Sequence, residues 1–432
     1  MTLDARASAI DLAVRHPKRI AMLSVHTSPL DQPGTGDAGG LNVYVVELSK
    51  RLAKLGTEVE IFTRATDLRQ APIAELTDGV RVHHLPAGPL EKINKSDLPG
   101  QLCGLTSGVL RSGRRFDAVH SHYWLSGQVG SVVSEHWDVP LVHSMHTMAR
   151  VKNRSLAGGD EPEPMMRVRG EQELVDGADG LISNTATEAA DLVELYDADI
   201  DRISIVHPGV DLDVFAPDDQ RVSRERVGVA ADALVMLFVG RIQPLKRPDV
   251  VIATTAALVE AEPALRDRLL TVICGGPSGA GMERVDELRK LAVDLGVADL
   301  VRFVPPSSRQ ELADWYRSAD VVCVPSQSES FGLVAIEAQA CGVPVVAAKV
   351  GGLSTAVHDR VSGLLVADHS IDAWRGAVST LLQQPRLREQ LGVGARTHAQ
   401  AFSWDATARK SIEAYRYAEL TRRAKALART SA

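Results

Sequence analysis

Short apolar runs rich in β-branched residues alternate with segments of helical periodicity along most of the chain, and this alternation limits the possible folds more than any other feature. The first series of runs ends at about residue 184, and a segment with helical spacing, 41–55, stops before Gly56. Strands separated by helices usually form parallel sheets covered on both faces. The runs lie at 20–26, 58–63, 118–122, 141–146 and 180–184.

The pattern then starts again after a segment, 206–217, that carries the Pro and Gly residues of a linker. Its runs lie at 234–240, 270–275, 301–304, 321–325 and 343–347, with a helical segment at 248–260. The fold class is therefore α/β, with two doubly wound, Rossmann-like domains facing a deep cleft. A chain of 432 residues suits two large domains. We expect them at 1–209 and 210–405, with a final helix, 406–432, crossing back to the first.

Charge and cysteine usage exclude several classes of partner. Lys and Arg total 48 against 55 for Asp and Glu, and the longest basic segment is 416–429, so nucleic acid is not expected. No apolar run approaches the roughly 20 residues of a membrane helix, and residues 1–19 lack the apolar core of a signal peptide. The four cysteines lack metal or redox spacing and suggest buried thiols in a reducing compartment. We expect a cytoplasmic protein.

A glycine-rich loop, 32–42, follows the first predicted strand, and Gly34, Gly36 and Gly39 satisfy the G-x-G-x-x-G pattern. The glycines lie too far beyond the strand for the tight turn of a dinucleotide site. The loop better suits a flexible lip whose Gly39 and Gly40 amides approach an anion at a helix N-terminus. A nicotinamide-dependent oxidoreductase remains an alternative, as does a purely structural loop.

Two cations and two carboxylates follow strands of the second series. Arg241 and Lys246 at a strand end suit a diphosphate that is neutralised as it leaves. Glu329 and Glu337 are eight residues apart, about 12 Å along a helix, whereas a glycosidase pair lies about 5 to 9.5 Å apart. This spacing favours carboxylates that hold hydroxyls at the two ends of a nucleotide sugar, while the amides of 331–333 meet the diphosphate.

Histidines concentrate at the predicted strand ends. None has the i, i+4 spacing of a zinc-binding helix, so packed residues or a polyol pocket are favoured, and a catalytic metal is a further alternative. These residues are His26, His120, His122, His143 and His146.

Together with Phe402-Ser-Trp404, these motifs resemble the retaining nucleotide-sugar glycosyltransferases of family 4, which have the GT-B fold, over about residues 20–404. The strings 26–42, 120–130 and 274–279 closely resemble the family members that act in mycothiol biosynthesis. The resemblance implies that UDP-N-acetylglucosamine donates its sugar, with retention, to 1D-myo-inositol 3-phosphate in the first step of that pathway.

The resemblance also implies roles for individual residues. On the donor side, Arg241 and Lys246 hold the diphosphate, Glu337 the ribose and Glu329 the sugar hydroxyls, and His146 lies beside the transferred sugar; we take Arg241, Lys246, Glu329 and His146 as the catalytic candidates. Further donor contacts are Gln32, Pro33, Gly40 and Ser307. The acceptor contacts are His26, Asp37, Ala38, Gly39, Gly40, Leu41 and Asn42, with Lys95, Tyr123, Thr147 and Arg167 around the phosphate.

Members of the family bind a structural magnesium through main-chain groups near positions equivalent to Tyr316, Arg317 and Ala319. Val343 stands here where a Thr is expected, which weakens that site, and Ser307 stands where an Arg is expected, which leaves uracil contacts to the backbone. We expect no cofactor to be required for catalysis, and a homodimer.

The mechanism we expect is front-face displacement, in which the acceptor hydroxyl attacks on the side that UDP leaves and the β-phosphate oxygen takes its proton. The competing functions are another family-4 enzyme, such as a sucrose-phosphate synthase or a lipid mannosyltransferase, the nicotinamide oxidoreductase, and a non-catalytic sugar-binding protein.

Overall fold

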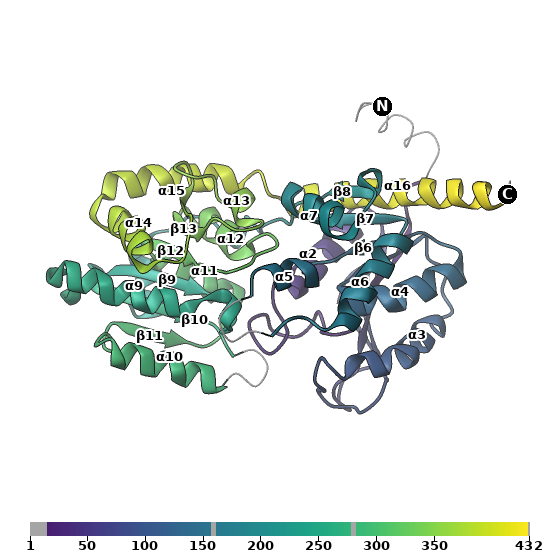
Figure 1. The fold of residues 1–432 in the computed structure, drawn as a ribbon, viewed down its shortest axis with the longest axis horizontal. Coiled ribbons are helices and arrows are strands. Elements are labelled where there is room, and N and C mark those ends of the chain that lie inside the picture. The colour runs from purple at the N-terminus through teal and green to yellow at the C-terminus, as the bar shows by residue number, and fades with distance from the viewer. Residues whose placement is uncertain (1–14, 157–160, 278–281, 431–432) are drawn as a thin grey trace.

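Two parallel-stranded sheets lie side by side in the computed structural model, which describes residues 15–156, 161–277 and 282–430 (Figure 1). Two earlier predictions fall partly outside these ranges. They concern residues 1–14 of the segment 1–19, which was not expected to be a signal peptide, and positions 278 and 279 of the string 274–279. No helix in the described ranges is long and apolar enough to cross a membrane.

The first sheet has eight strands in the order β3-β4-β2-β1-β5-β6-β7-β8, and only β3 runs antiparallel to its neighbour. The carboxyl ends of β1, β5 and β6 therefore meet at one edge, where ligands of α/β proteins bind. The strands are β1 (Arg19–Leu23), β2 (Glu58–Arg64), β3 (Ile73–Thr77), β4 (Val80–Leu85), β5 (Ala118–His122), β6 (Leu141–Ser144), β7 (Gly180–Ser183) and β8 (Ile203–Ile205).

Helices cover both faces of this sheet over two separate hydrophobic clusters. One cluster, around Tyr44 and Leu48, packs under α2 and the C-terminal helix α16, and the other, around Leu125 and Leu174, under α3, α4 and α6. The helices are α2 (Gly40–Lys54), α3 (Leu102–Leu110), α4 (Trp124–Trp137), α5 (Ala149–Arg154), α6 (Met165–Gly177) and α7 (Ala186–Tyr196), with short 3₁₀ turns at Leu98–Gln101 and Ile200–Arg202.

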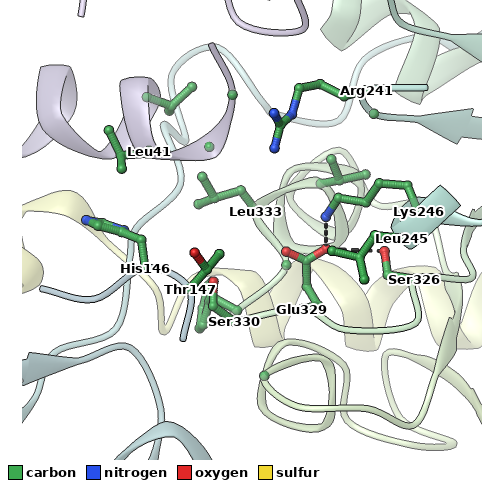
Figure 2. A pocket seen from close by; sticks show the side chains of 18 of the residues that line it. Leu41, His146, Thr147, Arg241, Leu245, Lys246, Ser326, Glu329, Ser330 and Leu333 are labelled. Atoms are coloured by element: carbon green, nitrogen blue, oxygen red, sulfur yellow. Dashed lines mark hydrogen bonds and ion pairs between the residues drawn. The ribbon is translucent and has the colours of Figure 1, made fainter. Parts of the chain in front are cut away.

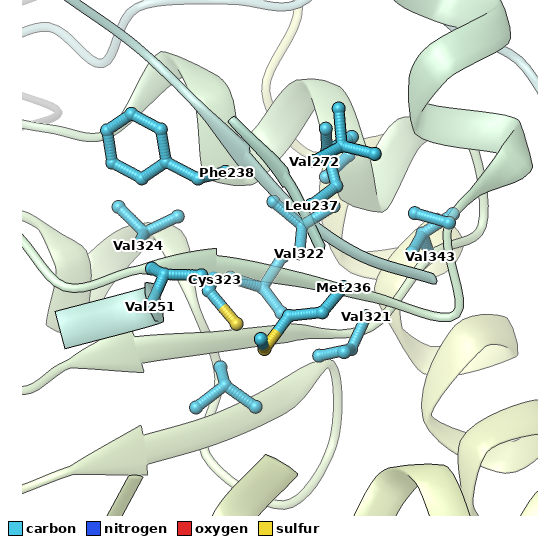
Figure 3. Packing of buried hydrophobic residues seen from close by; sticks show 14 of the residues in the cluster. Met236, Leu237, Phe238, Val251, Val272, Val321, Val322, Cys323, Val324 and Val343 are labelled. Atoms are coloured by element: carbon cyan, nitrogen blue, oxygen red, sulfur yellow. The ribbon is translucent and has the colours of Figure 1, made fainter. Parts of the chain in front are cut away.

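The second sheet is parallel throughout, in the order β11-β10-β9-β12-β13-β14. Its interior is a continuous cluster of small aliphatic side chains with few aromatic rings, as Figure 3 shows around Leu237 and Val322. The strands are β9 (Leu234–Val239), β10 (Leu269–Cys274), β11 (Val301–Val304), β12 (Val321–Val324), β13 (Val345–Ala348) and β14 (Gly363–Val366). The helices are α8 (Gln220–Val227), α9 (Pro248–Ala261), α10 (Met282–Asp294), α11 (Arg309–Ser318), α12 (Leu333–Ala340), α13 (Leu353–Ala356), α14 (Ile371–Gln383) and α15 (Pro385–Ala399), with 3₁₀ turns at Pro244–Lys246 and Pro263–Asp267.

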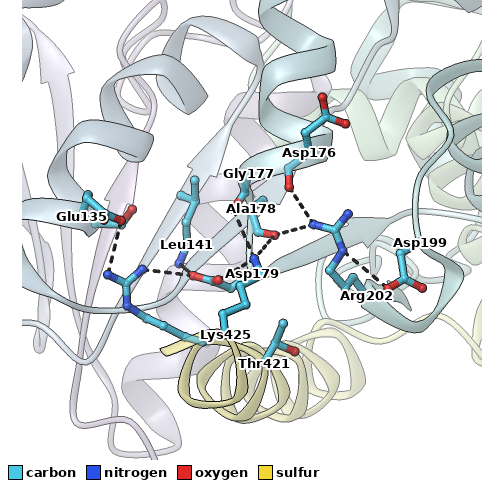
Figure 4. Close-up of polar contacts among 12 residues, drawn as sticks. Glu135, Leu141, Asp176, Gly177, Ala178, Asp179, Asp199, Arg202, Thr421 and Lys425 are labelled. Carbon is cyan, nitrogen blue, oxygen red and sulfur yellow. Dashed lines mark hydrogen bonds and ion pairs between the residues drawn. The ribbon is translucent and has the colours of Figure 1, made fainter. Parts of the chain in front are cut away.

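The C-terminal helix α16 (Trp404–Thr430) leaves the second domain and runs along the first (Figure 1). Its basic side chains explain part of the basic segment noted in the sequence: Arg422 pairs with Asp138 and Asp179, and Lys425 Nζ lies 2.9 Å from Asp179 (Figure 4). The predicted boundary at residue 209 falls in the connection between β8 and α8.

The predicted strands are present, with differences at their ends. The strand expected at 141–146 stops at Ser144, because His146 takes a left-handed backbone with φ +58°. Strands β3, β4, β8 and β14 were not predicted; β3 is a half-exposed edge strand and β8 has three residues, so neither has a buried apolar run. Cys103 was expected to be buried and is exposed, because its position on α3 faces away from the sheet; the other cysteines are buried.

Candidate active site

A cavity of about 820 Å³ lies between the two domains, and both contribute to its walls. Most residues predicted to bind donor or acceptor line it, whereas Ala38, Asn42 and Arg167 lie behind that first layer and are buried. The predicted residues in the lining are His26, Gln32, Pro33, Asp37, Gly39, Gly40, Leu41, Lys95, Tyr123, His146, Thr147, Arg241, Lys246, Ser307, Glu329 and Glu337.

Arg241 and Lys246 both come from the segment that follows β9, and Lys246 reaches Glu329 (Figure 2). Lys246 forms an ion pair with Glu329, and Ser326 Oγ donates a hydrogen bond to the same carboxylate at 3.3 Å. Desolvation by burial lowers the pKa of Arg241, and the nearby Asp37 and Glu329 oppose that effect. This wall therefore holds two cations that can exchange their carboxylate partners for an anionic ligand.

Glu329 lies in the loop before α12 and Glu337 lies within α12, so the two carboxylates stand on either side of the helix start, as predicted; the helical rise of about 1.5 Å per residue applies only from Leu333 onward. The chain turns into α12 at Gly332, whose φ of +108° favours glycine, and a Cβ there would lie 2.6 Å from Leu353 Cδ2. The residues predicted to offer amides, 331–333, line the cavity at the N-terminus of α12. Helix N-termini favour anions, so this turn suits a phosphate group.

Glu337 projects from α12, and its carboxylate accepts a hydrogen bond from the Tyr316 hydroxyl at 2.9 Å. Burial raises the pKa of Glu337 to about 7, opposed by that hydrogen bond and by the Arg309 guanidinium. A carboxylate so placed accepts hydrogen bonds from neighbouring hydroxyls at neutral and higher pH.

The glycine-rich lip crosses from β1 to α2 and reaches the second domain. Gln32 Nε2 donates to the Pro306 carbonyl across the domains at 3.2 Å. The expectation that the Gly39 amide meets an anion is wrong in this structure, because that N–H donates to Asn42 Oδ1 at 2.9 Å. Asn42 is buried and donates in turn to Thr27 Oγ1 at 2.9 Å, so its side chain holds the lip in place.

On the opposite wall, two cations flank the ring of Tyr123. Lys95 Nζ lies 4.3 Å and the Arg167 guanidinium 4.9 Å from the ring centroid, within cation–π range. Arg167 also donates to the Thr147 hydroxyl at 2.9 Å and pairs with Glu171 at 2.7 Å. Lys95 and Thr147 reach the cavity directly, whereas Arg167 supports them from behind.

Four of the strand-end histidines form hydrogen bonds, whereas His26 Nδ1 is buried without a partner, and no group of three or more His, Cys, Asp or Glu residues in the described ranges is arranged for a metal. His120 contacts the Tyr415 hydroxyl at 2.9 Å, and His143 contacts Ser121 Oγ at 2.8 Å. His122 Nδ1 and His146 Nε2 lie 2.8 Å apart. Burial lowers the pKa of His143 and of His146 to about 3.

The residues expected near a structural magnesium lie at the C-terminal end of α11 and before β13. The Tyr316 carbonyl accepts from the Ala319 N–H at 3.0 Å, and the Ala319 carbonyl accepts from Gln220 at 3.2 Å. Arg317 brings a cation, and Val343 is packed in the apolar core without a side-chain oxygen. Since Mg²⁺ prefers carboxylates and water, this donor set does not fit a tightly held magnesium.

One contact across the cleft was not predicted. Arg309 of the second domain lies 2.7 Å from Glu47, a buried carboxylate of α2, and 3.4 Å from Asp211. No local pattern could have revealed this pair, because 262 positions separate Arg309 from Glu47.

Comparison with known proteins fits this geometry. The profile of the Glycosyl transferases group 1 family matches residues 219–398, and that of the Glycosyl transferase 4-like domain matches residues 39–209. The sucrose-phosphate synthase of Thermosynechococcus elongatus superposes with a TM-score of 0.85 at 31% identity, covering 92% of this chain and 98% of that one. An Anabaena HepE structure in complex with UDP-glucose superposes with a TM-score of 0.74 at 20% identity, covering 92% of this chain and 98% of that one, and shows the same fold. Two Rossmann-like domains around this cavity define a GT-B glycosyltransferase.

Curated relatives show to which family of glycosyltransferases the chain belongs. The chain is 58% identical to D-inositol 3-phosphate glycosyltransferase 2 of Catenulispora acidiphila over 404 residues, covering 92% of this chain and 95% of the relative. It is 56% identical to the D-inositol 3-phosphate glycosyltransferase of Thermomonospora curvata, with the same coverage. The chain therefore belongs to the D-inositol 3-phosphate glycosyltransferase family.

Proposed function

We propose that this chain transfers N-acetylglucosamine from UDP-N-acetylglucosamine to 1D-myo-inositol 3-phosphate, with retention at the anomeric carbon, as the first step of mycothiol biosynthesis. The observation that carries the proposal is one cavity with a cationic wall on each side, Arg241 and Lys246 in the second domain and Lys95 beside Tyr123 in the first. A transferase that joins two phosphorylated substrates needs this arrangement, because each anion requires its own countercharge. The curated relatives carry the acceptor in their names.

The donor assignment rests on the second domain. A diphosphate bound between Arg241 and Lys246 would replace Glu329 as the negative charge that neutralises these two cations. Glu329, released from Lys246, would accept hydrogen bonds from hydroxyls of the sugar, and Glu337 would accept them from hydroxyls of the ribose. The turn into α12 would add amides to the diphosphate.

The acceptor assignment rests on the first domain. Lys95 and the Thr147 hydroxyl lie in the cavity wall, where a phosphate monoester would meet one cation and one hydroxyl. Arg167 keeps Thr147 in place by hydrogen bonds to its carbonyl and its hydroxyl. These groups would orient the inositol ring towards the donor sugar.

We propose front-face displacement as the mechanism. Glu329 lies on the diphosphate wall beside Lys246 and Ser326, where its carboxylate would hold hydroxyls, and we assign no carboxylate as a nucleophile at the anomeric carbon. The C–O bond to UDP breaks as the acceptor hydroxyl attacks from the same face, and the leaving β-phosphate oxygen takes the hydroxyl proton. Arg241 and Lys246 would offset the charge that develops on UDP, so the transfer requires no metal.

The finer cellular assignments are also proposals. The four cysteines, all free, fit a reducing compartment and support a cytoplasmic location. Ile200, just before the edge strand β8, and Ile205, the last residue of that strand, are both exposed and offer an apolar surface for the homodimer that the family resemblance implies. Light scattering on the purified chain tests the dimer.

The test of the proposed function is a pair of acceptor reactions. The purified protein is incubated with UDP-N-acetylglucosamine and either inositol 3-phosphate or fructose 6-phosphate, and the products are identified by mass spectrometry. We expect a glycosylated inositol phosphate and equimolar UDP in the first reaction only. A product formed in the second reaction and not in the first would instead favour a sucrose-phosphate synthase activity. This is the second candidate because the chain is 31% identical to a sucrose-phosphate synthase.

A further inference from the structure

His122 and His146 join two loops that leave adjacent strands of the first sheet. His122 is the last residue of β5, and His146 lies two residues beyond the end of β6. Their Nδ1 and Nε2 atoms are 2.8 Å apart, a hydrogen bond between two imidazoles. The ring of Tyr44 packs against both imidazoles, with centroids 5.7 Å from His122 and 5.1 Å from His146.

Each loop contains one residue in a backbone conformation with positive φ, which residues other than glycine rarely adopt. Tyr123, directly after His122, has φ +72°, and His146 has φ +58°. Such positions cost free energy and persist only where the surrounding structure holds them. The hydrogen bond ties the two strained positions to each other, beside the acceptor wall that Tyr123 and Thr147 form.

The chemistry of the pair is that of two neutral rings. Burial lowers the pKa of both histidines well below the ordinary value, so neither carries a charge at neutral pH, and one ring must donate. His122 Nε2 is buried without a hydrogen-bond partner. Because a buried N–H without a partner is rare, the proton belongs on His122 Nδ1, which donates to His146 Nε2.

The imidazole of His146 points away from the diphosphate wall, towards α2, as Figure 2 shows beside Leu41. Its ring therefore makes its hydrogen bond within the first domain, while His146 and Thr147 both line the cavity. His146 was predicted to lie beside the transferred sugar, and it lines the cavity.

We propose that His122 is a positioning residue for glycosyl transfer: through its hydrogen bond to His146 it holds the 146–147 backbone in the conformation that receives the donor sugar and the acceptor. The inference rests on the proposed function, because it assigns His122 a part in that same transfer. His122 itself is fully buried and lies behind the cavity lining.

The test compares two substitutions at His122 by steady-state kinetics. His122→Leu replaces the imidazole by an apolar side chain of similar size that has no N–H. His122→Asn provides an amide N–H close to the position of Nδ1. We expect His122→Leu to lower kcat about tenfold, the worth of one hydrogen bond, with KM values within threefold and unchanged UDP affinity, since the UDP wall is in the other domain. His122→Asn should regain at least half of the lost kcat.

A matched control uses His143, which is equally buried on β6 and whose Nδ1 is hydrogen-bonded to Ser121 Oγ and not to His146. His143→Leu should lower thermal stability and leave kcat near the wild-type value. An equal loss of kcat in His143→Leu, or no recovery in His122→Asn, would overturn the positioning role, as would an unchanged kcat in His122→Leu.

A second variant covers the case in which His122→Leu does not fold. His146→Asn tolerates the left-handed backbone and is too short to reach His122. We expect it to lower kcat as His122→Leu does, and His122→Asn to add no further loss in that background. An additional tenfold loss would contradict coupling through His146. If the wild-type chain forms no product in the same assay, the proposed function itself fails, and the inference falls with it.

Discussion

Replacing Glu337 by Gln is expected to stabilise the second domain above neutral pH while weakening its affinity for UDP. Burial raises the pKa of Glu337 to about 7, against an ordinary value of 4.5 in the unfolded chain. A carboxyl with a raised folded-state pKa contributes stability that is fully present below pH 4.5 and is lost as the pH rises through about 7. At about 1.36 kcal/mol per pH unit, the difference corresponds to ~3 kcal/mol.

Gln carries no charge at any pH and still offers Tyr316 an acceptor, so the variant escapes that loss. The unfolding free energy of Glu337→Gln relative to wild type should therefore rise by ~3 kcal/mol between pH 4.5 and 8.5. UDP affinity should fall about tenfold or more at pH 8.5, because the ribose hydroxyls lose a charged acceptor.

Urea unfolding followed by tryptophan fluorescence at both pH values measures the stability, and UDP titration measures the affinity. Glu287→Gln, at an exposed carboxylate of α10, is the matched control and should change neither quantity. If the stability difference between wild type and Glu337→Gln stays constant across this pH range, Glu337 is not a carboxylate held at a burial cost, and the reasoning is refuted.

Three further predictions concern the other parts of the cavity. Lys95→Met should raise KM for inositol 3-phosphate about tenfold with unchanged UDP affinity in a calorimetric titration; a loss confined to UDP would contradict the acceptor assignment. Glu47→Gln should weaken the contact of Arg309 across the domains and lower kcat several-fold, with a larger radius of gyration in X-ray scattering; an unchanged radius and kcat would show that this pair does not hold the domains together. EDTA should leave turnover intact, whereas loss of turnover restored by Mg²⁺ would disprove the metal-free mechanism.

The sequence alone was enough to predict features that depend on neighbouring residues. Apolar runs mark buried parallel strands because both faces of such strands are covered, and this placed Arg241 and Lys246 after β9, at the edge where ligands bind. The pattern was weakest where burial is incomplete, as at the edge strand β3 and at the exposed Cys103.

Contacts between distant segments were beyond the reach of such patterns. The Tyr316 hydroxyl donates a hydrogen bond to Glu337 from a neighbouring helix, and no local pattern joins these two residues. The residue at which α12 begins was also not predicted, because it depends on the left-handed backbone of Gly332, which residue spacing does not encode. The pairing of His122 with His146 depends on two strands whose order in the sheet only the fold reveals.

The measurement that tests the account most directly is the anomeric configuration of the product. Nuclear magnetic resonance of a reaction containing this chain, UDP-N-acetylglucosamine and 1D-myo-inositol 3-phosphate should show one new glycoside whose anomeric configuration matches that of the donor, formed in step with UDP. An inverted product, or hydrolysis of the donor without transfer to inositol 3-phosphate, would contradict the proposed function.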